Sequence, residues 1–294
     1  MTRSSPASYA PDIAARRVAV LSDVHGNLVA LRAVLADLDA AGAEAIVVAG
    51  DMVNFGPSSS EVVDLLRARG AHLIRGNHEA EYVAQYGTPA MPEAWGAGPR
   101  YSCLRWTMRA LGGERRGFLA GLPDRLWLDP ATVVAHGSPR RVREAVRADT
   151  PEERLAEMLP EPAIRLAVVG HTHRPLLREL PARPERPSCR FLNVGAVGDP
   201  LDGDSRASYA LLERAPSATP GDWRVTLRRV PYDLEAALAA YDGGLRQACP
   251  AFVELLTRQL RTGRPYFGPA VRALAEVTDD QVIPTLEHYL ATNP

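Results

Sequence analysis

Lysine is absent from this sequence of 294 residues, and all 34 basic side chains are arginines. We attribute this absence to a codon bias of the genome rather than to function. Because 35 acidic residues balance the arginines, the formal net charge is −1. No whole-protein field therefore attracts nucleic acid or an anionic membrane, and an extended nucleic-acid interface is not expected.

Cysteine is rare, and Cys103, Cys189 and Cys249 stand far apart. An odd number of cysteines without a C-x-x-C pair argues against a disulfide framework and against a thiolate zinc site. Residues 1–17 contain no apolar core of the kind that a signal peptide needs, and no run approaches the ~20 apolar residues of a membrane span. We therefore predict a cytoplasmic protein that contacts no membrane. A homo-oligomer remains open.

The apolar fraction of 46% and the charged fraction of 23% are ordinary for a globular protein. After an expected disordered lead, residues 1–16, short apolar runs alternate with stretches of helical spacing. The runs predict strands within 16–23, 44–51 and 71–77, and the stretches predict helices within 28–42 and 59–70. Three successive strand–helix units favour a parallel sheet with helices packed on it.

The remaining chain divides into three parts. Residues 80–123 are rich in Gly, Pro and aromatic side chains, and we expect a helical insertion over one sheet edge near the active site. Further strands are predicted within 126–137 and 163–171, followed by a run of antiparallel strands that ends near residue 235. Residues 236–294 are expected to form a helical extension packed on the same domain. The order predicts an α/β (α+β) fold, with two packed sheets of mixed strands and helices outside.

Polar residues gather where five of the predicted strands end. Five of the seven histidines and three of the five asparagines lie at these ends, in the segments SDVHGN, GDMVN, RGNHE, VVAHGSP and VVGHTHRP. Ligands of open α/β sheets bind beyond the carboxyl ends of the strands, so these residues should converge. The candidate metal ligands are Asp23, His25, Asp51, Asn77, His136, His171 and His173.

This ligand set contains nitrogen and oxygen donors and no thiolate. Such donors suit Mn, Fe, Zn, Co or Ni. Seven ligands are too many for one small ion, and they suit two ions ~3.5–4 Å apart, which is a known arrangement for phosphoryl displacement.

The motifs Asp23-x-His25, Gly50-Asp51, Gly76-Asn77-His78-Glu79, His136 and Gly170-His171-x-His173 resemble the signature of the calcineurin-like metallophosphoesterase superfamily. The resemblance covers roughly residues 17–235. The segments GDMVNFGP, HGSP, LNVGAVGDP and SYALL are similar to the bacterial branch with phosphodiesterase-like and diadenosine tetraphosphatase-like proteins. The resemblance implies a two-sheet β-sandwich flanked by helices.

The resemblance also implies roles for the residues. Asp23, His25 and His173 would bind the first ion, and Asn77, His136 and His171 would bind the second. Asp51 would bridge two divalent ions, with Mn foremost and Fe, Zn, Co or Ni as alternatives. A hydroxide between the ions would attack the phosphorus of a small phosphate ester or nucleotide, and His78 would act as general acid. Asn27 and Arg174 are further candidates for substrate contacts.

The sequence departs from one branch of the superfamily after its GD motif. Phosphoprotein phosphatases carry an aspartate followed by an arginine where this chain has Asn54 and Phe55. Asn54 can orient His78 by a hydrogen bond, but it cannot stabilise an imidazolium as a carboxylate would. We therefore predict a less basic His78 and discount a protein phosphatase. A turn-forming role for Asn54 is equally consistent with the pattern.

Several alternatives stay open. The leading hypothesis is a metal-dependent phosphodiesterase, and a phosphomonoesterase or a diadenosine tetraphosphatase would use the same ions. A non-catalytic scaffold, such as the retromer subunit of this fold, is the alternative from another class. Glu79 either aids His78 or begins a helix, and Asn193 either faces the site or caps a turn. The aromatic residues Trp95, Tyr101 and Trp106 either stack on a base or form a local core.

Overall fold

The computed structural model describes residues 13–184 and 186–293. The predicted lead, residues 1–16, lies for the most part outside this range. None of the helices in the described part of the chain has the length and apolar character needed to cross a membrane.

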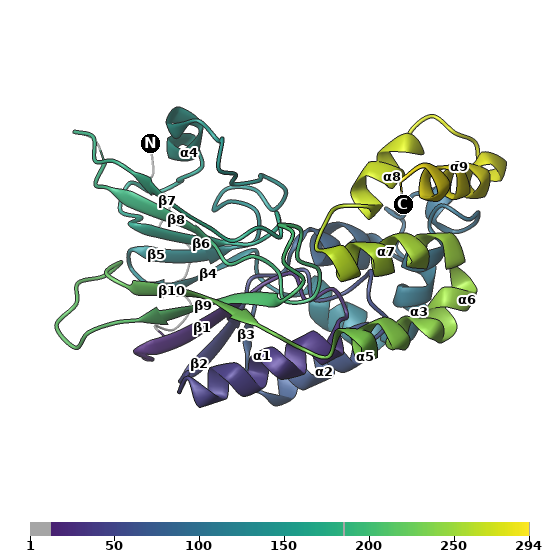
Figure 1. Cartoon of the computed structure of the whole chain (residues 1–294). Coiled ribbons are helices and arrows are strands. Elements are labelled where there is room, and N and C mark those ends of the chain that lie inside the picture. Colours follow the sequence, from purple (N-terminus) through teal and green to yellow (C-terminus); the bar gives the residue numbers. More distant parts are fainter. Residues whose placement is uncertain (1–12, 185, 294) are drawn as a thin grey trace.

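Two five-stranded sheets pack face to face, as expected for this fold class (Figure 1). The first sheet has the spatial order β10 (Arg224–Val230), β9 (Ala207–Glu213), β1 (Arg17–Leu21), β2 (Ala45–Val48) and β3 (His72–Leu73). The second has the order β4 (Arg125–Asp129), β5 (Thr132–Ala135), β6 (Leu166–Val169), β8 (Cys189–Asn193) and β7 (Leu176–Leu180).

Both sheets are mixed: β9 and β10 run antiparallel in the first sheet, and the edge strands β4 and β7 run antiparallel in the second. Strands β1, β2 and β3 are parallel, as are β5, β6 and β8. The antiparallel run predicted after residue 175 is confirmed for the pairs β7–β8 and β9–β10. It is wrong between β8 and β9, because β8 lies beside β6 in the second sheet and β9 lies beside β1 in the first. Apolar patterning identifies a strand, but it does not say which sheet the strand joins.

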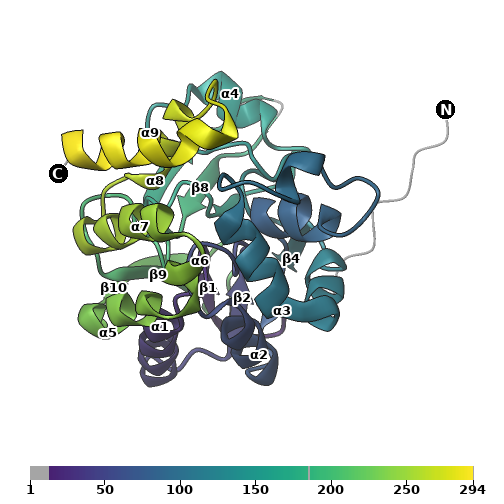
Figure 2. The same cartoon turned by 90° about the vertical axis from the view of Figure 1, so that its right-hand side faces the viewer.

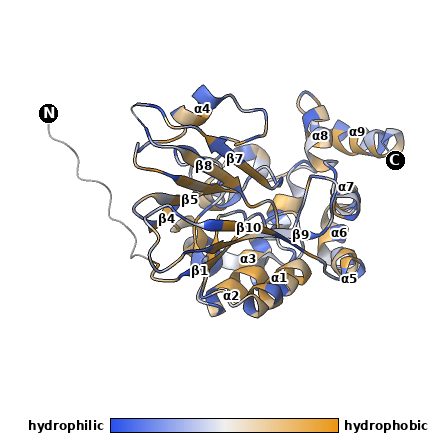
Figure 3. Cartoon of the chain, turned by 60° about the vertical axis from the view of Figure 1, so that its left-hand side comes forward, coloured by the Kyte–Doolittle hydropathy of each residue, from blue (hydrophilic) through white to orange (hydrophobic). Residues whose placement is uncertain are grey.

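Alternate residues of β1 face two different cores. Val18 and Val20 point between the sheets, into a cluster that contains Leu166 and Val168 of β6, and all four are fully buried. Ala19 and its neighbours on the same face pack against the helices outside the first sheet. Complete burial of an aliphatic side chain contributes about 1.5–3 kcal/mol, so this alternation fixes which face each residue occupies. Both sheets are orange over most of their strands in Figure 3.

Helices cover the outer faces of both sheets. The elements from the amino-terminal part of the chain are α1 (Leu28–Ala40), α2 (Ser59–Ala68), the π-helix η1 (His78–Val83), the 3-10 turn η2 (Glu93–Trp95), α3 (Ser102–Ala120) and α4 (Glu152–Glu157). The first sheet packs on α1 and α2, whereas α4 packs on the second sheet. The predicted insertion, residues 80–123, contributes most of η1, η2 and α3.

The carboxyl-terminal helices form a cluster beyond the strand ends, together with α3 (Figures 1 and 2). These elements are α5 (Leu234–Ala239), the 3-10 turn η3 (Ala240–Asp242), α6 (Gly244–Ala248), α7 (Pro250–Thr262), α8 (Phe267–Ala273) and α9 (Asp279–Thr292). Their buried faces form a core of their own, with Phe252, Leu256 and Leu286 among its members.

A disulfide joins Cys103 of α3 to Cys249, the residue before α7. The expectation that cysteine pairing is absent is therefore wrong for this pair. The two residues are 146 positions apart in sequence, yet their Cα atoms lie 5.7 Å apart. The tertiary fold alone creates this proximity, since no spacing rule relates the two positions. Cys189 is buried and free.

Candidate metal centre

The carboxyl ends of the parallel strands from both sheets meet at one place, and the predicted ligands follow these ends. Seven non-glycine residues in the described chain have a positive φ, namely Asp23, His25, Asp51, Asn54, Phe55, His171 and His173. Backbone strain of this kind costs about 1–3 kcal/mol per residue and persists where the surroundings impose it, often at functional sites. Every one of the seven lies in the loops that build this centre.

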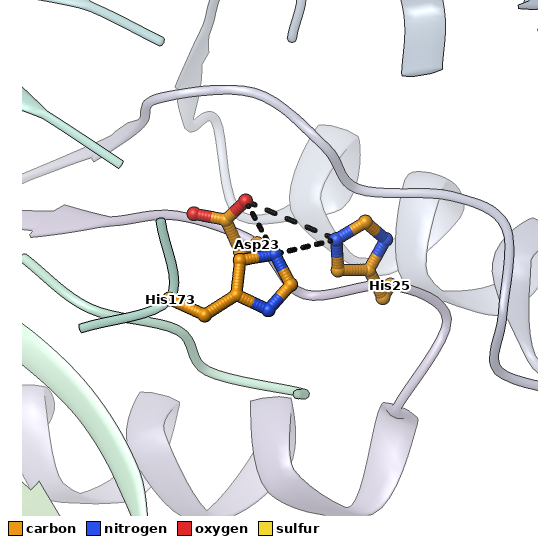
Figure 4. Close-up of side chains that lie close together, drawn as sticks. All are labelled: Asp23, His25 and His173. Carbon is orange, nitrogen blue, oxygen red and sulfur yellow. Dashed lines mark hydrogen bonds and ion pairs between the residues drawn. The ribbon is translucent and has the colours of Figure 1, made fainter. Parts of the chain in front are cut away.

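Asp23, His25 and His173 form the first cluster (Figure 4). Nε2 of His173 lies 3.2 Å from Oδ1 of Asp23 and 3.2 Å from Nε2 of His25. Nε2 of His25 is 3.8 Å from the same carboxylate oxygen. The three side chains are buried and direct their donor atoms at a common point.

The tautomers of three histidines follow from their backbone contacts. Nδ1 of His25 lies 3.1 Å from the carbonyl oxygen of Val53, and Nδ1 of His136 lies 2.7 Å from that of Ala49. A carbonyl oxygen only accepts, so each Nδ1 carries a proton and donates. The same holds for His173, whose Nδ1 donates to the carbonyl oxygen of Asp199 at 2.5 Å. In the neutral rings the Nε2 lone pairs therefore face the centre, as in metal-ligating histidines.

The second cluster contains Asp51, His136 and His171. Nε2 of His136 lies 3.2 Å from Oδ2 of Asp51 and 3.0 Å from Oδ1 of Asn77. The rings of His136 and His171 meet edge to face, with centroids 5.1 Å apart. All the predicted ligands of a second ion thus gather on one side of Asp51.

Asp51 stands between the two clusters. Its Oδ2 is 3.8 Å from Nε2 of His25 in the first cluster and 3.2 Å from Nε2 of His136 in the second. Its Oδ1 accepts a hydrogen bond from the backbone N–H of His78 at 2.8 Å. A Cβ atom at Gly76 would overlap this carboxylate, so glycine is required for the close approach.

Charge accumulates at the centre. Burial alone would raise the pKa of Asp23, but His173 and His136 outweigh it and lower this pKa to about 2. Burial would lower the pKa of His136, but Asp51 and Asp23 outweigh it and raise this pKa to about 9. Oδ1 of Asp23 is buried and has no hydrogen-bond partner, although three imidazoles surround it. An unpaired buried carboxylate oxygen among converging lone pairs fits divalent cations, and the residues present therefore suit a binuclear site.

His78 begins the π-helix η1, a type of element that is frequent at functional sites. Nδ2 of Asn54 donates to Nδ1 of His78 at 2.9 Å, so the proton of the neutral ring is on Nε2. Nε2 lies 4.0 Å from Oδ2 of Asp51 and points at the centre. Burial, against the opposing effect of Asp51, lowers the pKa of His78 to about 3. The pKa shift has the expected direction, but its largest cause is burial, so the effect predicted for Asn54 stays a prediction.

Two carboxylates outside the predicted ligand set hold the centre in shape. Glu79 accepts from the backbone N–H groups of Gly76 and Asp51 at 2.8 Å and of Met52 at 2.9 Å, so it clamps the two loops together. Asp199 has an oxygen 3.3 Å from Nδ1 of His173. Only the Gly-Asp-Pro motif after a strand marks Asp199 in the sequence, and the family resemblance assigns this residue no role.

The Asp199 carboxylate is held by a side chain from the carboxyl-terminal helices. Nδ1 of His173 faces Asp199, and both Asp199 oxygens accept from Nε2 of Gln259 in α7 at 2.8 Å. Oε1 of Gln259 accepts from the backbone N–H groups of Tyr266 and Phe267 at the start of α8. The helical extension thus reaches a candidate ligand through two buried side chains.

The remaining candidates have other surroundings. Asn27 caps α1, because its Oδ1 accepts from the N–H of Ala30 and its Nδ2 donates to the carbonyl of Gly198. Both groups serve the fold, and the substrate contact predicted for Asn27 is not proposed further. Asn193 donates to the carbonyl of Gly170 and so positions the histidine loop. Arg174 is exposed and lines a different cavity, so its contact with substrate stays a prediction.

Comparison with known proteins matches this geometry. The family model described as calcineurin-like phosphoesterase matches residues 16–175. A metallophosphoesterase from Sphaerobacter thermophilus, known as a crystal structure, is 32% identical, with a TM-score of 0.65, over 84% of this chain and 99% of that one. An uncharacterized protein of Methanocaldococcus jannaschii is 28% identical over 242 residues, 75% of this chain and 89% of the relative. A hypothetical protein from Pyrococcus horikoshii, 21% identical over 85% of this chain and 99% of its own, shares the fold with a TM-score of 0.66.

Proposed function

The chain belongs to the calcineurin-like phosphoesterase family, and from this premise we propose that it is a binuclear metal-dependent hydrolase of phosphodiesters or nucleotides. The observation that carries the proposal is the position of Asp51, whose Oδ2 faces Nε2 atoms of both histidine clusters. A carboxylate in this position could be shared by two cations. The related proteins support membership of the family, whereas the preference for a diester substrate is part of our proposal.

We propose that Asp23, His25 and His173 hold one ion and that Asn77, His136 and His171 hold the other, with Asp51 shared. Two divalent ions, manganese in our proposal, would neutralise phosphate charge and lower the pKa of a water molecule. The protein's own part is to keep the donor atoms converged, which the strained loops and the Glu79 clamp do before any ion binds.

His78 is the candidate general acid and would act as hydrogen-bond donor to the leaving oxygen. Its Nε2–H points at the centre, and Asn54 holds the ring through Nδ1. Because the pKa of His78 is low, the ring is neutral at neutral pH, and its Nε2–H would donate a hydrogen bond that stabilises the negative charge developing on the leaving oxygen. Asn54 stabilises this tautomer, since its amide donates only to an unprotonated Nδ1.

The test is hydrolysis of bis(p-nitrophenyl) phosphate by the purified chain with added Mn²⁺. We expect turnover that a chelator abolishes, and a loss of about 10²–10⁴-fold in kcat for His78→Ala with unchanged metal content. His288→Ala, an exposed histidine on α9, is the matched control and should keep full activity. A panel of cyclic nucleotides, dinucleoside polyphosphates and monoesters then separates the enzyme alternatives. No turnover, together with no metal by elemental analysis, would overturn the proposal in favour of a scaffold.

A further inference from the structure

A cavity of about 370 Å³ opens next to His78. Asn77, His78 and Asn54 form the end that faces the metal centre. This volume lies within the range of small-molecule sites, about 300–1,000 Å³. Because His78 lines the cavity, the leaving group of a substrate at the metal centre would face into it.

The walls of the cavity come from segments that are far apart in sequence. Tyr82 and Tyr101 belong to the insertion, whereas Phe252, Phe267 and Val271 come from α7 and α8. The Cys103–Cys249 disulfide joins the two sides covalently, and Cys103 itself lines the cavity. Of the three aromatic residues considered from the sequence, only Tyr101 lies at this cavity.

Aromatic rings surround His78 on the cavity side. The ring of Phe55 lies 4.8 Å from His78 and 4.7 Å from Phe267, and the ring of Tyr82 lies 5.3 Å from His78, between centroids. Phe55, Phe267 and Tyr82 are half-buried, so each ring leaves part of its surface open. Phe55 has a φ of +68°, a conformation that a bulky residue adopts only when the fold imposes it. The strain holds an apolar ring beside the proton donor.

The charges at the cavity are of one sign. No acidic side chain lines it among the described residues, and its two ionic residues are Arg100 and Arg143. Arg100 donates to the carbonyls of Leu274 and Val277, and Arg143 pairs with Glu81. A cationic leaving group such as an ammonium would find no carboxylate here, whereas a flat neutral ring finds several π-faces.

We propose that this cavity binds an aromatic ring carried by the leaving alcohol, as in a nucleoside ester, and so selects aromatic over aliphatic phosphate esters. The inference rests on the proposed function, since the ring must be attached to the phosphate that is cleaved. Stacking on aromatic side chains tolerates different bases, and the mainly apolar lining offers few groups to read a base edge. The selectivity is therefore for the ring rather than for one base.

The experiment compares three methyl phosphate diesters whose second alcohol is benzyl, cyclohexylmethyl or methyl. The benzyl and cyclohexylmethyl groups have similar size but differ in aromaticity. We expect the wild-type chain to prefer the benzyl over the cyclohexylmethyl ester by about tenfold in kcat/KM, and Phe267→Ala to remove most of this preference. Leu227→Ala is the control. It removes a large apolar side chain of β10 that is 38% exposed and does not line the cavity, so it should leave the ratio unchanged.

Two outcomes overturn the inference alone. The inference is refuted if kcat/KM is equal for the benzyl and cyclohexylmethyl esters, or if Phe267→Ala does not alter their ratio. Neither result would contradict the proposed hydrolase function. If none of the three esters is hydrolysed, calorimetric binding of benzylphosphonate decides the cavity, and the proposed function fails only if bis(p-nitrophenyl) phosphate is not hydrolysed either. Saturable binding that Phe267→Ala weakens about tenfold supports the site, and the absence of saturable binding refutes it.

Discussion

Nε2 of His25 and Nε2 of His173 lie 3.2 Å apart, and the Nδ1 atom of each ring is turned to a backbone carbonyl. Two neutral imidazoles in this arrangement present lone pairs to each other, which is stable only with a cation between them. In the metal-free protein a proton takes that place, because Asp23 and Asp199 outweigh burial and raise the pKa of His173 well above its usual value, whereas burial and His173 lower that of His25.

Metal binding should therefore release protons and stabilise the fold. We expect two Mn²⁺ per chain by elemental analysis, an affinity that rises from pH 6 to pH 8, and a gain of about 2.7 kcal/mol in unfolding free energy per ion at a free concentration of 100 Kd. Calorimetry in buffers of different ionisation enthalpy counts the protons. Asp51→Ala should weaken both ions and Asp23→Ala mainly one. A pH-independent affinity would contradict this account.

The metal-free protein should be most stable near pH 6.5. Burial lowers the pKa of His78 to about 3 and that of His171 to about 4, so below 6.5 the unfolded chain takes up protons that the folded chain does not. The unfolding free energy then falls by up to about 1.4 kcal/mol per pH unit for each histidine. His136, with its pKa raised to about 9, contributes stability that is complete below 6.5 and is lost as the pH rises through 9. Urea unfolding in chelator at pH 4.5, 6.5 and 9 tests both slopes.

Asn54→Asp should make His78 more basic. A carboxylate 2.9 Å from Nδ1 would accept a proton from this atom and stabilise the imidazolium. We expect the pKa of His78, followed by NMR in the metal-free protein, to rise by at least one unit. Asn54→Ala, which removes the contact without adding charge, should show no such rise. An unchanged pKa in Asn54→Asp would show that burial alone governs His78.

Gln259 should act on the metal centre as a positioning residue. Gln259→Leu leaves Asp199 without the donor that holds both of its oxygens, so His173 loses its orientation. We expect one of the two ions to bind about 10–100-fold more weakly, with the other affected less. Gln247→Leu, an exposed glutamine of α6, is the control. Circular dichroism of the metal-free variants separates a lost contact from a lost fold, and equal weakening of both ions would refute the positioning role.

The Cys103–Cys249 disulfide should stabilise the helical cluster. Its two residues are separated by 146 positions, and closing so long a loop constrains the unfolded chain, so we expect Cys249→Ser to lower the unfolding free energy by about 2–5 kcal/mol. Thiol titration of the denatured, unreduced protein should find one free cysteine, Cys189. Three titratable thiols would show that the bond does not form in the purified protein.

The sequence was sufficient to predict the two-sheet fold class, and it placed His171 and His173 at the end of a buried strand. Strand ends could be read because an apolar run that stops at Gly, Asp and His is a local signal, and parallel strands bring such ends together by geometry. The same local logic failed for β9, since its pattern does not say which sheet it joins.

Only the tertiary structure decided which side chains complete the site. Gln259, Asp199 and His173 form one chain of contacts across 86 positions, the difference between 259 and 173, and no periodicity links them. The disulfide and the cavity beside His78 likewise depend on how the carboxyl-terminal helices pack on the insertion. A sequence records which donors exist at each strand end, whereas long-range packing sets their distances, tautomers and partners. These in turn decide what chemistry the donors can perform.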